Sequence, residues 1–182
     1  MKKMYDETEA PIKVFGLPLL YETGEWRELP EQLMHDVPTI HQFGRLVTGS
    51  RIAFSTNASE FTIRCRVKMQ FENEATSWLF GTGFNVYAGE RTSARYLGYL
   101  SITQYGFEWL NIEKTFKKGS NDVEDITIYL APQVFVERCE IIVDSDAVVE
   151  EPTPYKYAKP VVFFMAHQLQ PAEPQAEQEI PT

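Results

Sequence analysis

The sequence has few histidines and cysteines, two residue types that often carry catalysis or bind metals. Among its 182 residues are three histidines and two cysteines. Cys65 and Cys139 form no CxxC pair and do not cluster with histidine, which argues against a zinc site. No other metal or cofactor motif stands out. We therefore expect a chain with no metal and no cofactor.

Long apolar runs and a positive charge balance are also missing. No stretch approaches the roughly 20 apolar residues that cross a bilayer, and no apolar segment follows the first lysines as in a secretory signal. These absences favour a cytoplasmic protein with reduced thiols. The formal net charge of −9 argues against nucleic-acid binding and against docking on anionic lipid. We expect neither partner.

Helical periodicity is weak, and alternation with period two dominates instead. The clearest case is the segment Phe61–Met69, in which apolar residues at odd positions alternate with polar residues. Such alternation is typical of a strand with one buried face. Further strands are expected at residues 42–47, 51–55, 83–87, 96–103, 107–110, 126–130 and 139–144, and a turn at Thr48-Gly49-Ser50 could close a hairpin between the first two of these. A short helix is expected at residues 29–36. Close, regular spacing of strands predicts an all-β, antiparallel sandwich or barrel.

Composition divides the chain into four parts. Residues 1–11 are expected to be flexible, and residues 12–150 to form the sandwich. The stiff segment EEPTP (residues 150–154) leads into residues 151–167, which also contain a short apolar run at residues 160–164. Residues 168–182 are rich in Pro, Gln and Glu, a composition that predicts disorder.

Candidate catalytic residues are not found. The three histidines, His35, His41 and His167, belong to no motif, and no GxSxG elbow is present. Both cysteines occupy the inward phase of their strands and are expected to act as small hydrophobic residues. Carboxylates in polar stretches do not follow the spacing of a calcium loop, so we expect solvated loop charges; they are Glu72, Glu74, Asp122, Glu124 and Asp125.

Two sets of residues are candidates for binding. Arg64, Arg66 and Lys68 form a basic row on one strand face, which requires acidic neighbours across the sheet or an anionic partner; acidic neighbours are favoured. Six aromatic residues could supply a stacking surface for carbohydrate. They are Trp78, Tyr87, Tyr96, Tyr99, Tyr105 and Trp109. We expect half or more of them to be buried in the core. The predicted ligand-binding residues are Trp78, Tyr105, Trp109, Arg64 and Arg66.

Several segments, in order, resemble the N-terminal domain that precedes the catalytic domain of certain SGNH/GDSL-type esterases. They are Leu29-Pro30, GSRIAFSTNAS (residues 49–59), FTIRCR (61–66), DITIYLAP (125–132) and PYKYAKPVVFF (154–164). The resemblance implies a jelly-roll-like β-sandwich that packs against a flavodoxin-like catalytic domain. It also implies that residues 151–167 hold the linker and first strand of that domain.

The family's serine block should follow this strand, but Met165-Ala166-His167-Gln168 contains neither Gly nor Ser. The family's catalytic residues therefore transfer to no position here. The resemblance implies a non-catalytic accessory domain that helps to recognise an acylated, carbohydrate-like substrate, with an SGNH catalytic domain or chain as partner. Two alternatives stay open, namely an independent carbohydrate-binding module and a free-standing esterase with an unfamiliar site.

Overall fold

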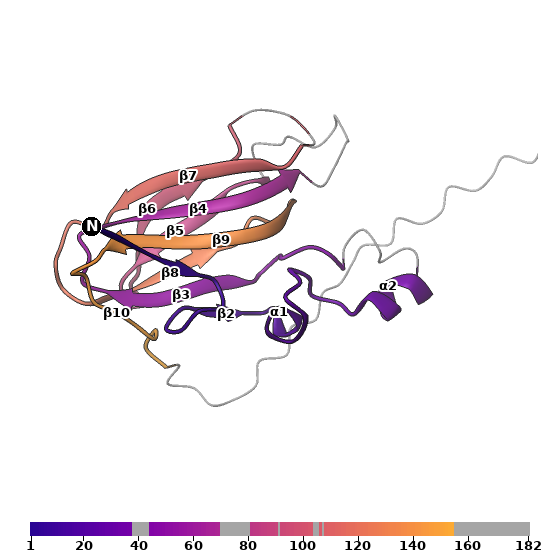
Figure 1. Cartoon of the computed structure of the whole chain (residues 1–182), viewed down its shortest axis with the longest axis horizontal. Coiled ribbons are helices and arrows are strands. Elements are labelled where there is room, and N and C mark those ends of the chain that lie inside the picture. The colour runs from indigo at the N-terminus through magenta and orange to yellow at the C-terminus, as the bar shows by residue number, and fades with distance from the viewer. Residues whose placement is uncertain (38–43, 70–80, 91, 104–105, 107, 155–182) are drawn as a thin grey trace, which may run out of the picture.

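Two antiparallel sheets face each other in the computed structural model, which describes residues 1–37, 44–69, 81–90, 92–103, 106 and 108–154 (Figure 1). Sheet A has the strand order β1-β9-β4-β7, and sheet B has the order β10-β3-β8-β5-β6, with β2 also paired to β3. The strands are β1 (Lys2–Asp6), β2 (Lys13–Phe15), β3 (Arg51–Thr56), β4 (Glu60–Met69), β5 (Phe84–Ala88), β6 (Arg95–Leu100), β7 (Leu110–Lys117), β8 (Glu124–Tyr129), β9 (Val134–Asp144) and β10 (Val149–Glu150). The predicted antiparallel sandwich is confirmed.

The core lies between the two sheets and follows the alternation seen in the sequence. Every second residue of β4 is buried, from Phe61 to Met69. The Phe61 ring contacts Phe54 of β3 edge-on and stacks on Phe116 of β7, with centroid distances of 5.8 Å in both cases. Aromatic pairs of these geometries add to the free energy gained by burying their area. Phe61 therefore ties the two sheets together.

The N-terminal segment differs from the expectation of flexibility. Residues 2–6 form strand β1, which pairs with β9 in the register Lys2↔Asp144 to Asp6↔Glu140. Tyr5 is buried in the core. The sandwich thus begins at Lys2 and not at Ile12. The sequence did not indicate this strand because only one of its five residues, Tyr5, is buried, which leaves no alternation to detect.

The prediction of a hairpin around Thr48-Gly49-Ser50 is wrong for its first strand, which was expected at residues 42–47. Residues 44–47 are turn and irregular backbone, while residues 42 and 43 lie outside the described residues. The partners of β3 are instead β2, β8 and β10. The prediction paired two segments that are adjacent in the sequence, whereas β3 forms hydrogen bonds with strands that lie far from it along the chain.

Two short helices lie beside the sandwich, on the right of Figure 1 where β4 ends and β9 begins. Helix α2 (Glu31–Asp36) confirms the expected helix, with Pro30 as the residue that precedes its first turn. Helix α1 (Pro18–Thr23) was not predicted, although Pro18 suits a first turn and Gly24, at φ 75°, ends it in the left-handed conformation. Neither helix, nor any other in the described ranges, has the length and apolar character needed to cross a bilayer.

Candidate ligand-binding site

The outer face of sheet A carries a ladder of ion pairs. Arg64 lies opposite Glu113 of β7 and Glu140 of β9. Its Nε is 2.6 Å from Glu113 Oε2 and its Nη1 is 3.5 Å from Glu140 Oε2. Arg138 Nε approaches the other oxygen of Glu140 at 3.2 Å. Glu140 is 5% exposed, so two guanidinium groups compensate a buried carboxylate.

The predicted basic row is thus compensated at two of its three positions. Arg64 follows the favoured reading with Glu113 and Glu140, and Arg66 follows it through an ion pair with Glu137 of β9. Lys68 differs, since no ion pair or hydrogen bond of its ammonium group appears among the described residues. At Lys68, the alternative of an anionic partner stays open.

Arg66 and Trp109 come together, as the two sets of predicted binding residues require. The guanidinium carbon of Arg66 lies 6.0 Å from the centroid of the Trp109 ring, at the outer limit of a cation–π contact. Trp109 is 37% exposed, so part of the indole is accessible to solvent. Trp78 and Tyr105, the other predicted aromatic residues, lie outside the described residues.

A pocket of about 350 Å³ opens beside Trp109 at the end of β4. Lys68 and Phe135, opposite each other on β4 and β9, form its floor with Val136. Its remaining lining comes from the chain between α1 and α2, from the first residue of α2 and from the loop before β3: Glu25, Trp26, Arg27, Glu31 and Arg45. The pocket joins an aromatic wall to three cationic side chains, and its volume lies within the range of small-molecule sites.

Arg27 forms ion pairs with both acidic residues that line this pocket. Its guanidinium pairs with Glu25 and approaches Glu31 Oε2 at 3.6 Å. Arg45 and Lys68 also line the pocket, and neither forms an ion pair with a carboxylate in the described ranges.

Tyrosine side chains gather on the outer face of sheet B. Tyr87 contacts Tyr96 and Tyr129 at centroid distances of 5.3 and 5.7 Å. The ring planes meet at 54° and 87°, so these rings are not coplanar and form no flat stacking surface. Tyr96 and Tyr99 are exposed, and Tyr87 is partly buried. The expectation that the core claims half or more of the aromatic set is wrong for its described members.

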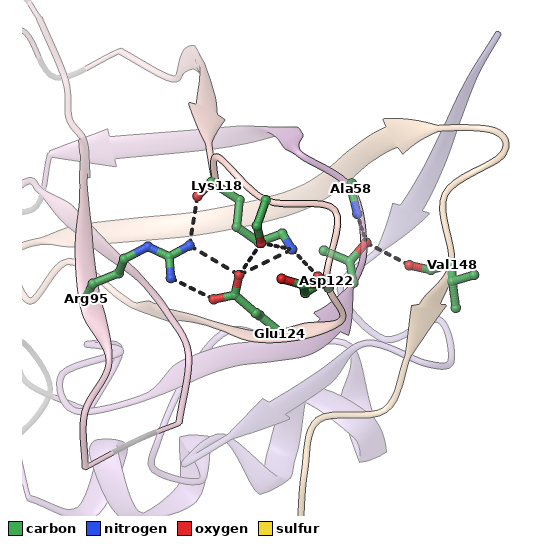
Figure 2. Close-up of polar contacts among 8 residues, drawn as sticks. Ala58, Arg95, Lys118, Asp122, Glu124 and Val148 are labelled. Carbon is green, nitrogen blue, oxygen red and sulfur yellow. Dashed lines mark hydrogen bonds and ion pairs between the residues drawn. The ribbon is translucent and has the colours of Figure 1, made fainter.

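The carboxylates Glu124 and Asp125 are not solvated loop charges as expected. Figure 2 shows Glu124 between Arg95 Nη1, at 2.7 Å, and Lys118 Nζ, at 3.6 Å. Lys118 has no exposed side-chain surface, and it also donates to the backbone carbonyl of Asp122. The hydrogen bonds from Arg95 and then Ser120 lower the pKa of Glu124 to about 2. This cluster fastens the loop between β7 and β8 and is structural.

Asp125 fastens the end of the sandwich in a similar way. Its carboxylate accepts hydrogen bonds from the hydroxyl of Ser55 and from the backbone N–H of Thr153, the latter at 3.0 Å. The chain that follows β10 is therefore held against the outer face of sheet B. The other predicted loop carboxylates, Glu72 and Glu74, lie outside the described residues, and Asp122 is exposed.

Groups suited to nucleophilic catalysis do not converge in the described ranges. His35 lies on exposed α2, with Nδ1 3.4 Å from Asp36 Oδ1, and His41 and His167 fall outside those ranges. Cys65 and Cys139 are buried in the core, as expected. Within the same ranges, no group of three His, Cys, Asp or Glu side chains is placed to hold a metal ion.

The comparison with protein families agrees with the sandwich and with its order of segments. Residues 3–149 match the family model described as GxDLY, the N-terminus of SGNH-hydrolase-type esterases. The chain belongs to the GxDLY family. This GxDLY domain covers nearly the whole described sandwich, from β1 to the first residue of β10. No curated protein matches the chain.

Two solved structures resemble this GxDLY domain in fold. One, from Bacteroides ovatus ATCC 8483, is described as a GDSL-like lipase, with a TM-score of 0.66 and 17% identity over 84% of this chain and 44% of that one. The other is the salicylyl-acyltransferase SsfX3 of a tetracycline biosynthetic pathway, with a TM-score of 0.62 and 10% identity over 85% of this chain and 42% of that one. The GxDLY chain spans less than half the length of either.

The sequence predicted two residues on the outer face of sheet A near the pocket, but most of the residues that line the pocket were not predicted. Trp109 and Arg66 were predicted, and Lys68 was noted as part of the basic row. Arg27, Arg45 and Phe135 were missed, since they come from three separate segments. The one available signal was the alternation of β4, which placed Lys68 on an outward face.

Proposed function

We propose that this chain is a non-catalytic accessory domain of an SGNH/GDSL-type esterase, which packs against the catalytic domain and assists recognition of an acylated, carbohydrate-like substrate. The observation that carries this proposal is the family match over residues 3–149. It identifies the sandwich with the N-terminal part of SGNH-type esterases. The two solved neighbours, in which the matched part is less than half of the chain, support the same division.

The path of the chain suggests where a catalytic domain would meet the sandwich. After β10, Ser55 donates to the carbonyl of Glu151 at 3.3 Å, and Asp125 accepts the N–H of Thr153. Ser55 and Asp125 share the outer face of sheet B with Tyr87 and Tyr129, since residues alternate along each strand. Exposed aromatic surface of this kind is common at protein interfaces. We therefore assign the tyrosine face to the contact with a catalytic domain.

The pocket beside Trp109 supports the recognition part of the proposal. A partly exposed indole that lines a pocket can provide a stacking surface for a sugar ring, and neighbouring charged groups can orient its substituents. The same pocket favours the second candidate function, an independent carbohydrate-binding module. The two functions differ in whether a catalytic partner is required.

Co-expression distinguishes these functions. The chain is produced with a separately cloned SGNH-type catalytic domain, and hydrolysis of acetylated xylooligosaccharides is measured for each protein alone and for the pair. The proposal predicts co-purification, background hydrolysis by this chain alone and a higher kcat/KM for the pair. A catalytic domain that stays separate, or whose kcat/KM is unchanged by this chain, would leave the binding module as the better account.

A further inference from the structure

The pocket beside Trp109 also carries an excess of positive charge, on a chain whose net charge is −9. Three cationic side chains line it, against the two carboxylates of Glu25 and Glu31. Both carboxylates are engaged by Arg27, whose side chain is 13% exposed. Neither of the two carboxylates that line the pocket is therefore available to pair with Arg45 or Lys68.

This lack of partners is unusual for the molecule. The other lysines and arginines of the described ranges form ion pairs, hydrogen bonds or ring contacts, with the exception of Lys117 on β7. Three cations therefore lack such a contact in that part of the chain, and two of them, Arg45 and Lys68, line one pocket. Two cations at one concave position that pair with none of the described residues of an acidic protein suit the binding of an anion there.

A buried donor in the same lining points the same way. Arg27 Nε is buried and has no hydrogen-bond partner among the described residues. A buried donor without an acceptor costs free energy unless a further group satisfies it. An anionic ligand in the pocket would bring acceptors close to Arg27 as well as to Arg45 and Lys68.

We infer that this pocket binds a small organic carboxylate of about one sugar ring, such as a uronic acid, with the ring against Trp109 and the carboxylate between Lys68 and Arg45. The volume of about 350 Å³ lies at the lower end of the range for small-molecule sites, which fits one ring and not a long chain. Phe135 and Val136 provide an apolar floor. This inference rests on the proposed role in substrate recognition and names the chemistry of the group recognised.

Isothermal titration calorimetry of the whole chain tests the inference, with sodium D-glucuronate as the probe and D-glucose and inorganic phosphate as comparisons at constant ionic strength. We expect glucuronate to bind at least about tenfold more tightly than glucose, because a charge-assisted hydrogen bond is about twice as strong as a neutral one. Phosphate should bind more weakly than glucuronate, because it lacks a ring to stack on Trp109. Binding should weaken as salt is raised.

Substitutions locate the site. Arg45→Gln and Lys68→Gln should each weaken glucuronate binding by about fivefold or more, the loss expected for one charged contact at a partly exposed position. Trp109→Ala should weaken it too. Lys117→Gln is the matched control, since it removes an equally unpartnered cation far from the pocket, and it should leave binding unchanged. None of these cations forms an ion pair, hydrogen bond or ring contact with the described residues, so the variants should keep the melting temperature of the parent.

Several outcomes would overturn the inference. They are the absence of heat at millimolar glucuronate, equal affinity for glucose and glucuronate, equal affinity for phosphate, and a Lys117→Gln variant as impaired as Lys68→Gln. Each of these would leave the accessory role intact, because that role is tested by co-purification and kcat/KM of the pair. Failure of the pair with normal glucuronate binding would instead remove the accessory role and keep the site.

Discussion

Cys65 and Cys139 lie directly opposite each other on β4 and β9, with their sulfur atoms 2.6 Å apart in the core. The backbone N–H of Cys139 donates to Glu7 Oε2 at 3.2 Å, and so points away from β4. The two cysteines are therefore a non-hydrogen-bonded pair of the ladder, the type in which facing side chains come closest. Contact with the Cys65 sulfur, followed by burial, raises the pKa of the Cys139 thiol.

The first prediction concerns the reactivity of these thiols in protein purified under reducing conditions. Because the thiolate is the reactive form, a buried thiol with a raised pKa should react with Ellman's reagent slowly at pH 8. Both cysteines should react at once in guanidinium chloride. A thiol that reacts within the mixing time in native protein would contradict the buried pair.

The same pKa shift has a consequence for stability. The folded state holds the Cys139 proton to higher pH than the unfolded state does, so the free energy of unfolding should fall as the pH rises above about 8.5, the ordinary thiol value. Cys139→Ala should lose this fall. Urea denaturation from pH 7 to pH 10 measures it, and identical slopes for the parent and the variant would count against a raised pKa.

A second prediction concerns Glu124. Glu124→Gln should destabilise the fold by about 2 kcal/mol or more, because the fully buried ammonium of Lys118 loses its carboxylate partner. Glu113→Gln is the matched control and should cost less than about 1 kcal/mol, since its ion pair is exposed and Arg64 keeps Glu140. Equal losses in urea denaturation would show that burial of Lys118 does not matter.

The pH dependence of this cluster follows from the lowered pKa of Glu124, which is about 2. A carboxylate with a depressed folded-state pKa contributes stability above its unfolded value. This contribution is lost as the pH falls from about 4.5 towards 2. The parent should therefore lose stability across that window more steeply than Glu124→Gln, and equal slopes would contradict the assignment.

A third prediction concerns Glu28, whose pKa desolvation raises to about 7. The folded state then binds a proton that the unfolded state releases, so stability falls as the pH rises from about 4.5 to 7. Glu28→Gln should raise the melting temperature at pH 8 by about 2–4 °C, the shift that 1 kcal/mol gives in a chain of this length. The gain should vanish at pH 4. Glu22→Gln, at an exposed position of α1, is the control and should show no gain at either pH.

A fourth prediction concerns Phe61, which contacts Phe54 and Phe116 across the core. Phe61→Ala should cost about 3–5 kcal/mol, the usual loss for a buried phenylalanine. Phe61→Leu keeps most of the volume and should cost less than about 1.5 kcal/mol. Chemical denaturation measures both, and a small loss for alanine would mean that the sheets are not held together at this position.

Much of the sandwich could be predicted from the sequence because its inner strands alternate over many residues. The strand Phe61–Met69 was confirmed, as β4, since one face is core and the other is solvent. The short strands β1 and β2 have too few residues for alternation to be detected. Pairings between distant segments, such as β1 with β9, are set by packing and leave no local pattern.

The candidate site was predictable only in part, for a related reason. An outward row of Arg64, Arg66 and Lys68 follows from alternation alone. The partner of each cation depends on which strands flank β4, and the sequence does not state that order. The burial of Lys118 depends on its contacts with Glu124 and Asp122, whose positions only the folded loop defines.

The central claim is that the chain assists an SGNH-type esterase and is not itself the catalyst. The most direct measurement is the initial rate of acetate release from acetylated xylooligosaccharides as this chain is titrated into a catalytic domain that has been purified separately. We predict a rate that rises to saturation with added chain, and a rate equal to the buffer blank when the catalytic domain is omitted. Saturable turnover by this chain alone, or a rate that does not change on titration, would contradict the account.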